Sequence, residues 1–124
     1  MHTTSVNYSD KTAKVQAAIT AHFEWFDKLK IAITRGRSEF KPEVICEDNN
    51  CEFGKWIYSD LRNYCSDDKA YKEIQQIHAE FHKKASEILS MALRGDVDNA
   101  SREVAHGSKL SSISGRLAII LHRL

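Results

Sequence analysis

A chain of 124 residues, with 42% hydrophobic and 28% charged residues, has the composition of one globular domain that is long enough to bury a core. Its 18 basic and 17 acidic residues leave a net charge of +1, which gives no electrostatic reason to expect a nucleic-acid or membrane partner. One proline and five glycines argue against a turn-rich β fold, and no apolar run approaches the length of a membrane span. The polar N-terminus lacks a signal-peptide pattern and three cysteines cannot form a closed set of disulfides, so we expect a cytoplasmic location.

Residues 1–8 are interpreted as a flexible leader, and the domain is expected to span residues 9–124. Ser9 or Asp10 is placed to cap the first helix. From there apolar positions recur every three or four residues, as in a helix that faces a bundle: Val15, Ile19, His22, Phe26, Leu29 and Ile33. His22 stands where Leu or Ile is usual, and Trp25 broadens the apolar face. Gly36 is expected to end this helix in a left-handed C-cap.

Residues 37–50 are the least regular part of the chain. Pro42 cannot lie inside a helix, and the acidic run 47–50 is rich in turn-forming residues, so a loop with a short helical piece is predicted. Residues 51–61 fit a short amphipathic helix that opens with Cys51 and has Trp56 on its apolar face. Gly54, inside this helix, would allow another helix to approach its backbone closely.

The cleanest helical period follows a cap at Ser66 or Asp67 and ends at Arg94 and Gly95. Its apolar positions are Tyr71, Ile74, His78, Phe81, Ala85, Ile88 and Ala92. This pattern predicts a long helix with two histidines at or beside its inner face.

A last helix is expected from Val97 to the C-terminus, capped by Asp96. Its first half is small and polar on the inner face, whereas its second half is strongly apolar and offset. The apolar tail, formed by Leu117, Ile120, Leu121 and Leu124, is therefore a candidate dimer seam or the start of a helix that enters a downstream domain. Together the elements predict an all-α fold, an up-down helical bundle of three long helices and one short, cysteine-bearing helix.

His78 and His82 are four residues apart, so their imidazoles lie on one helical face. With His22 and Cys51 they provide three imidazoles and one thiolate from three helical segments, a donor set that suits tetrahedral zinc. Taken singly, His22 also fits a hydrogen-bonded core histidine and Cys51 an inert thiol, so the pattern alone leaves these alternatives open. His106, next to a glycine, is the competing histidine.

Three segments in this order resemble the chemoreceptor zinc-binding (CZB) domain family: Ala-His22-Phe-Glu-Trp25, Cys51-Glu-Phe-Gly54-Lys-Trp56 and His78-x-x-x-His82. The resemblance covers about residues 15–124. It implies a helical bundle with one zinc ion per chain, held by His22, Cys51, His78 and His82. The wall of the site is expected to be formed by Trp25, Gly54, Trp56 and Phe81.

The resemblance also implies a cytoplasmic sensory or regulatory domain that forms a homodimer. Its output would be of the chemotaxis or cyclic-di-GMP type, in a chemoreceptor or diguanylate cyclase domain in cis or in trans; the sequence contains neither domain. Four protein ligands would close the coordination sphere of zinc, so we do not expect an enzyme.

Three alternatives remain open at this stage. The first is oxidant sensing through a zinc-bound thiolate of Cys51. The second is an iron- or oxygen-binding bundle of the hemerythrin kind, which needs bridging carboxylates, although His22 has Phe26 rather than Glu at the fourth following position. The third is a plain bundle with incidental histidines.

Overall fold

The computed structural model of the chain describes residues 2–47, 51–59, 61–65 and 67–124, with side-chain surroundings from residue 11 onward except for Glu52. Over these residues the secondary structure is helical, without strands, which confirms the predicted all-α class. The elements in order are α1 (His2–Arg35), α2 (Pro42–Ile45), α3 (Glu52–Ile57), the 3-10 helix η2 (Leu61–Tyr64), α4 (Asp68–Leu93), α5 (Val97–Val104) and α6 (Lys109–His122).

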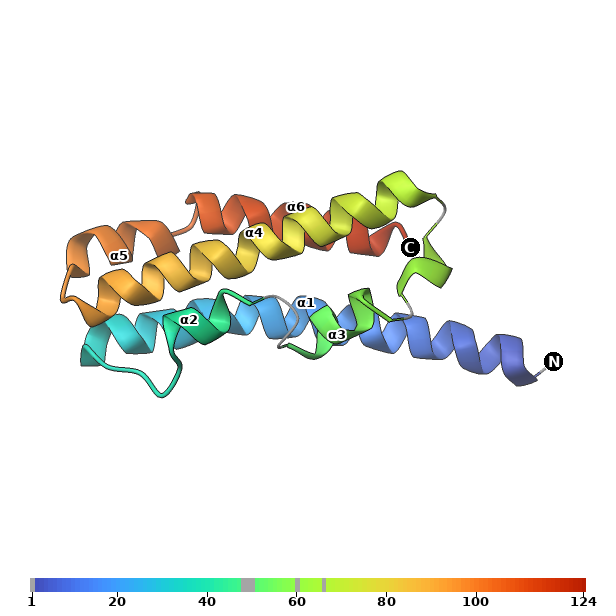
Figure 1. Cartoon of the computed structure of the whole chain (residues 1–124), viewed down its shortest axis with the longest axis horizontal. Coiled ribbons are helices and arrows are strands. Elements are labelled where there is room, and N and C mark those ends of the chain that lie inside the picture. The colour runs from blue at the N-terminus through green and yellow to red at the C-terminus, as the bar shows by residue number, and fades with distance from the viewer. Residues whose placement is uncertain (1, 48–50, 60, 66) are drawn as a thin grey trace.

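The helices form an elongated bundle in which α1 and α4 run in the same direction, side by side (Figure 1). The return segment from α2 to η2 consists of short elements, of which α2 packs on α4 and α3 on α1, and α5 and α6 run back along α4. The directions therefore alternate as in an up-down bundle, with the return segment in the place of a second long helix. Lys11 Nζ of α1 donates to the backbone oxygen of Leu124 over 2.7 Å, which fixes the C-terminus beside the first turns of α1.

The first helix begins earlier than predicted. α1 starts at His2, so neither Ser9 nor Asp10 caps it, and residues 2–8 of the expected leader are helical. Neither proline nor glycine interrupts residues 2–35, and cap preferences do not stop a helix that has no such breaker. The division of the chain into a leader, 1–8, and a domain, 9–124, stays a prediction. Gly36 does end α1 in the left-handed region, with φ +68°.

The middle of the chain contains the two helical pieces predicted there and, among the described residues, a 3-10 helix that was not predicted. α2 confirms the expected helical piece, with Pro42 in its first turn, where the missing N–H costs nothing. The helix predicted over residues 51–61 ends at Ile57, and the chain tightens into η2 from Leu61. Ser59 Oγ donates to the carbonyl of Lys55 over 2.9 Å, a local bond that competes with helix continuation. Asp48, Asn49 and Asn50 of the predicted acidic turn lie outside the described residues.

α4 follows its prediction closely. Asp67 caps it, with its side chain accepting from the Ala70 amide over 2.8 Å; Ser66, the other candidate cap, lies outside the described residues. The buried positions of this helix include most of the predicted stripe and both histidines, and Gly95 follows its end with φ +82°.

The prediction of one continuous C-terminal helix is wrong. The chain breaks after Val104, Gly107 takes φ +87°, and the Ser108 hydroxyl accepts from the Ser111 amide to start α6. Asp96 stands at the cap of α5, but its carboxylate accepts from the side chain of Asn99 rather than from a backbone amide. Because of this break, the apolar faces of α5 and α6, which are offset in the sequence, both pack against the core of the bundle.

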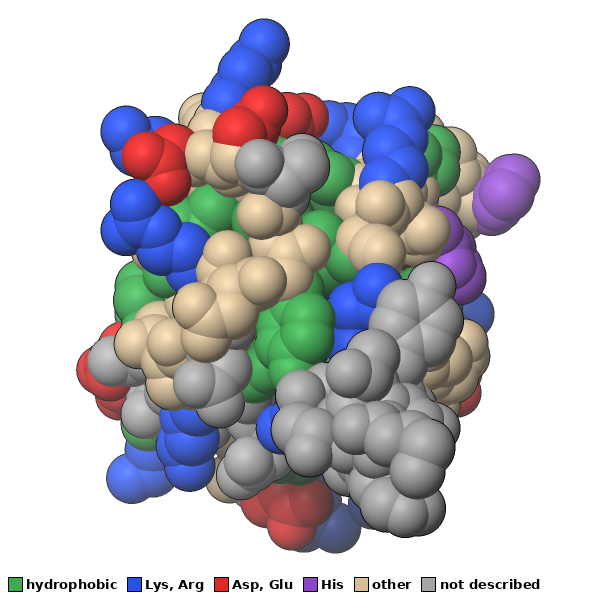
Figure 2. Space-filling model, turned by 90° about the vertical axis from the view of Figure 1, so that its right-hand side faces the viewer, with side chains coloured by type: hydrophobic (Ala, Val, Ile, Leu, Met, Phe, Trp, Pro, Cys, Tyr) green, Lys and Arg blue, Asp and Glu red, His purple; other side chains and the backbone are tan. Residues whose placement is uncertain are grey.

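The core therefore uses the residues that were predicted to form a dimer seam. Leu117, Ile120 and Leu121 are buried inside the bundle and Leu124 packs against it, so this seam does not exist as an exposed surface. Seen from the end that carries both termini, charged side chains are spread around the rim and hydrophobic ones lie in the middle (Figure 2). Among the described residues, none of the helices has the length and apolarity that crossing a bilayer requires.

Candidate metal centre

Three elements bring four potential metal donors to one place inside the bundle. His22 lies on the core face of α1, Cys51 is the residue that caps α3, and His78 and His82 occupy successive turns of α4. One donor atom from each of these residues lies within 4.8 Å of all the others. The structure thus brings together the four residues that were selected from the sequence.

The spacing of the donors is close to that of a zinc polyhedron. Cys51 Sγ is 3.3 Å from His78 Nε2, and His78 Nε2 is 3.0 Å from His82 Nε2. The ring of His22 meets those of His78 and His82 edge to face, with centroids 4.9 and 5.5 Å apart. With the usual zinc bond lengths, tetrahedral donors stand about 3.3 to 3.6 Å apart. Two donor pairs therefore already stand near the spacing that zinc requires, and the cluster would contract where its donors are up to 4.8 Å apart.

Backbone carbonyls set the orientation of two imidazoles. His22 Nδ1 is 2.6 Å from the carbonyl oxygen of Ala18, and His82 Nδ1 is 2.9 Å from that of Ile45. Because a carbonyl only accepts, both Nδ1 atoms carry the proton and both Nε2 atoms present a lone pair to the site. His22 Nε2 is buried without a hydrogen-bond partner among the described residues. Such an atom fits a metal ligand better than a satisfied core histidine.

Burial also keeps these rings in the form that binds metal. It lowers the pKa of His22 to about 4, against a smaller raising effect of the Ala18 carbonyl and with a further lowering by His82. Burial, together with His82 and His22, lowers the pKa of His78 to about 2. Both imidazoles are therefore neutral at pH 7, as coordination requires.

Cys51 has the environment of a metal-binding thiolate. Its sulfur accepts from the backbone amide of Gly54 over 3.2 Å, as an N-cap side chain does at the start of a helix. A helix N-terminus and an amide donor both favour negative charge on sulfur. Gly54 is buried in the first turns of α3, and its observed role is this amide contact.

Aromatic side chains surround the four donors. The ring of Phe81 lies 5.0 Å from that of His22, and Trp56 is buried beside Phe53, 5.8 Å away. Phe53 itself packs edge to face on His78, with centroids 5.1 Å apart, and was not selected from the sequence. Its position two residues after Cys51 was the only available signal.

A pocket reaches the site from the side of α1 and α3. This pocket has a volume of about 390 Å³ and has His22, Cys51, Trp25, Trp56 and Lys14 among its lining residues. Lys14 Nζ stands 5.7 Å from the Trp56 ring. Cys51 is partly exposed, whereas the three histidines are buried. The thiol is thus the donor that a solute in this pocket reaches.

The other candidates lie elsewhere. His106 is exposed between α5 and α6, and Cys46 and Cys65 are free thiols outside the cluster. Among the described residues the cluster contains no carboxylate, so it lacks the bridging ligands of a hemerythrin-like di-iron centre. Glu80 and Glu103, which stand near the histidines in sequence or in the bundle, approach Arg116 and Lys84 instead.

The comparison with protein families gives one match. The model of the chemoreceptor zinc-binding domain matches residues 22–89, more than half of the chain, and this range contains all four donors. Comparison with curated proteins and with solved structures gives no match.

Proposed function

Because the chain belongs to the chemoreceptor zinc-binding domain family, whose cofactor is zinc, we propose that His22, Cys51, His78 and His82 hold one zinc ion and that its occupancy regulates a signalling output. The observation that carries this proposal is the convergence of the four donor atoms within 4.8 Å, from segments far apart in the chain. The Nδ1 hydrogen bonds of His22 and His82 support it, because they turn the other ring nitrogen of each histidine inward.

The proposed role is regulatory rather than catalytic. Three histidines and one cysteine fill a tetrahedral sphere, whereas a catalytic zinc keeps a position for water. Much of the core, around Leu29, Ile88 and Leu110, has no ligand side chain in it. A bundle with this much buried apolar surface is expected to stay folded without metal, which suits a sensor.

The element proposed to respond is α3. A bound zinc ion would supply one junction shared by α1, α3 and α4. Cys51 ties the start of α3 to this junction, while the hydroxyl of Tyr71 on α4 donates to the carbonyl of Ile57 at its other end, 2.6 Å away. Loss of the Cys51 bond would release one end of α3 and leave the other end in place. The proposed signal is this helix rearrangement.

The proposal extends to a cytoplasmic homodimer. The cysteines that the structure describes are all free, as is usual in a reducing compartment. A dimer contact would use exposed apolar residues, because the predicted seam residues Leu117, Ile120 and Leu121 are buried; Phe23, 48% exposed and stacked on Phe26, is such a residue. The output would be of the chemotaxis or cyclic-di-GMP type, in a chemoreceptor or diguanylate cyclase domain in cis or in trans.

Metal analysis tests the ligand assignment directly. We expect one zinc per chain by mass spectrometry, and competition against a chelator of known affinity should show at least a roughly hundredfold weaker affinity in Cys51→Ala. Cys65→Ala is the matched control and should keep the wild-type affinity, while circular dichroism should show both variants helical. A zinc affinity unchanged in Cys51→Ala would contradict the proposal.

A second candidate function rests on the pocket that reaches Cys51. The thiolate could attack hydrogen peroxide, forming a sulfur–oxygen bond as the oxygen–oxygen bond breaks; the second oxygen leaves as hydroxide, which takes a proton from solvent to become water, and the sulfur becomes a sulfenic acid. Peroxide treatment of the zinc-loaded protein should then add one oxygen atom at Cys51 and release zinc. Oxidation at Cys46 or Cys65 with zinc retained would exclude this route.

A further inference from the structure

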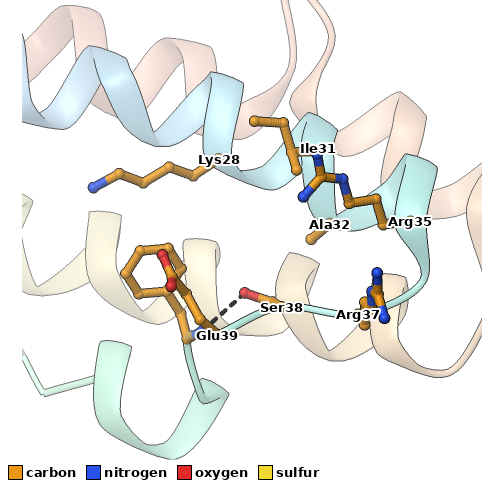
Figure 3. Close-up of a pocket in the computed structure, with 8 residues that line it drawn as sticks. Lys28, Ile31, Ala32, Arg35, Arg37, Ser38 and Glu39 are labelled. Carbon is orange, nitrogen blue, oxygen red and sulfur yellow. Dashed lines mark hydrogen bonds between the residues drawn. The ribbon is translucent and has the colours of Figure 1, made fainter.

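A second pocket lies at the opposite end of α1 from the chain termini, where the helix meets the loop of residues 36–41 (Figures 1 and 3). Its volume is about 470 Å³, within the range of small-molecule sites. Ser38 Oγ accepts from the Phe40 amide over 2.9 Å, so the loop that closes the pocket has a defined turn. Its charged and large apolar lining residues are Lys28, Ile31, Arg35, Arg37, Glu39 and Phe40.

The charge of this pocket is uncompensated. Three cations, Lys28, Arg35 and Arg37, line it against the single carboxylate of Glu39. In the part of the chain that the structure describes, none of these four side chains takes part in an ion pair. Elsewhere, Lys84 pairs with Glu103 over 2.6 Å and Arg62 with Asp68 over 2.6 Å.

The helix dipole accounts for only part of this clustering. Arg35, in the last turn of α1, is favoured by the negative end of the helix. Lys28 lies almost two turns earlier, beyond the reach of that effect, and Arg37 follows the helix. The two arginines lie at the same end of the pocket, where an anionic group would neutralise them (Figure 3).

The pocket also has an apolar wall. Ile31 of α1 is 51% exposed at the edge of the pocket, and Phe40 lines it from the loop. Phe40 is held by the ring of Trp25, 5.1 Å away, and Lys28 Nζ stands 5.2 Å from the Phe40 ring centroid. The ammonium group of Lys28 thus lies beside the Phe40 ring, and Ile31 adds apolar surface to the same pocket.

We propose that this pocket binds a small organic anion, in which a phosphate or carboxylate group pairs with Arg35 and Arg37 at the loop end of the pocket and an aromatic or aliphatic body packs on Ile31 and Phe40, toward Lys28 (Figure 3). Arginine forks match both oxyanions. The site is distinct from the metal cluster, because none of its lining residues is one of the four candidate metal donors.

Titration of the zinc-loaded protein with phenyl phosphate, benzoate, inorganic phosphate and neutral phenol tests the proposal. Amide resonances of residues 28–40 should shift on addition of phenyl phosphate or benzoate. The probe that binds more tightly shows whether the pocket prefers a phosphate or a carboxylate group. Inorganic phosphate should bind roughly tenfold more weakly than phenyl phosphate, because it lacks the apolar body. Phenol should bind weakly because it lacks the charge.

Arg35→Gln should weaken binding of the preferred probe by roughly tenfold, and the loss should grow at low salt. Arg94→Gln is the matched control, since Arg94 also precedes a left-handed glycine at a helix end but does not line this pocket. Shifts confined to the metal donors, equal effects of the two variants, or binding of an acidic peptide but no small anion would each overturn the proposal.

Discussion

At the scale of single residues, the protonation state of the buried histidines decides how the metal-free protein responds to pH. His22 and His78 have pKa values lowered to about 4 and about 2, mainly by burial, while an exposed imidazole titrates near 6.5. Below pH 6.5, His22 and His78 therefore bind protons in the unfolded chain but remain neutral in the folded chain. The contribution of these histidines to stability is complete above that pH and falls as the pH decreases.

The first prediction is the size of this fall. Each of the two histidines should cost about 1.4 kcal/mol of unfolding free energy per pH unit below pH 6.5, and the loss from His22 should end near pH 4. Urea unfolding between pH 7 and pH 5, with a chelator present, measures it. His22→Leu should show a shallower slope than wild type, whereas the control His106→Ala should keep the full slope. Parallel curves for wild type and His22→Leu would contradict the burial argument.

At the scale of elements, α2 is a short helix with an influence beyond its length. The carbonyl of Ile45, its last residue, accepts from His82 Nδ1, and the carbonyl of Pro42, its first residue, accepts from Ser86 Oγ of α4 over 2.8 Å. Ser86 lies one turn after His82 on α4. This helix therefore carries the candidate metal donor His82 and also holds α2, whose Ile45 carbonyl orients the His82 ring.

Ser86→Ala is therefore predicted to weaken zinc binding without unfolding the bundle. Loss of one hydrogen bond should cost about 1 kcal/mol of stability, and the freed α2 should lower zinc affinity by roughly tenfold. Thr34→Ala is the control, because it removes a hydroxyl that donates to a carbonyl inside α1. Chelator competition on both variants decides, and equal affinities would show that α2 does not position His82.

The break between α5 and α6 gives a second prediction at this scale. Gly107 has φ +87°, which a side chain opposes, whereas Gly115 lies inside α6, where an added methyl group would meet no atom within 4 Å. Gly107→Ala should lower the unfolding free energy by about 1 kcal/mol, and Gly115→Ala should raise it by up to about 1 kcal/mol. Urea unfolding of the pair measures both, and a stabilising Gly107→Ala would mean that the break is not required.

At the scale of the whole molecule, sequence periodicity predicted the features that depend on side-chain type, namely the core faces of the helices and the histidines on them. The stripes of α1 and α4 gave the core faces and, through His22, His78 and His82, three of the donors. The carbonyls of Ala18 and Ile45 could not be predicted, because every residue carries one and only the fold selects which meets an imidazole. The only sign of the break between α5 and α6 in the sequence was that the apolar faces of the two halves are offset. Such an offset fits one long helix that contacts a partner as well as it fits two helices joined by a turn.

The last prediction concerns how far loss of metal spreads through the molecule. The apolar core includes residues of α5 and α6, which carry none of the four candidate donors, whereas Cys51 is the candidate donor at the start of α3. Chelation should therefore raise hydrogen exchange at the amides of α3, including that of Gly54, which donates to the Cys51 sulfur. The amides of α4 near Ile88 should keep their protection.

Two matched measurements separate a sensor from a structural zinc protein. Cys51→Ala with excess zinc should reproduce the exchange pattern of the chelated wild type in α3, because both lack the same bond. Cys65→Ala should resemble the zinc-loaded wild type. If chelation removes protection from α3 and α4 together, the metal holds the whole fold and cannot act by moving one element. If α3 stays protected after chelation, Tyr71 and the buried face of α3 are sufficient to hold it, and the signal must arise in another element.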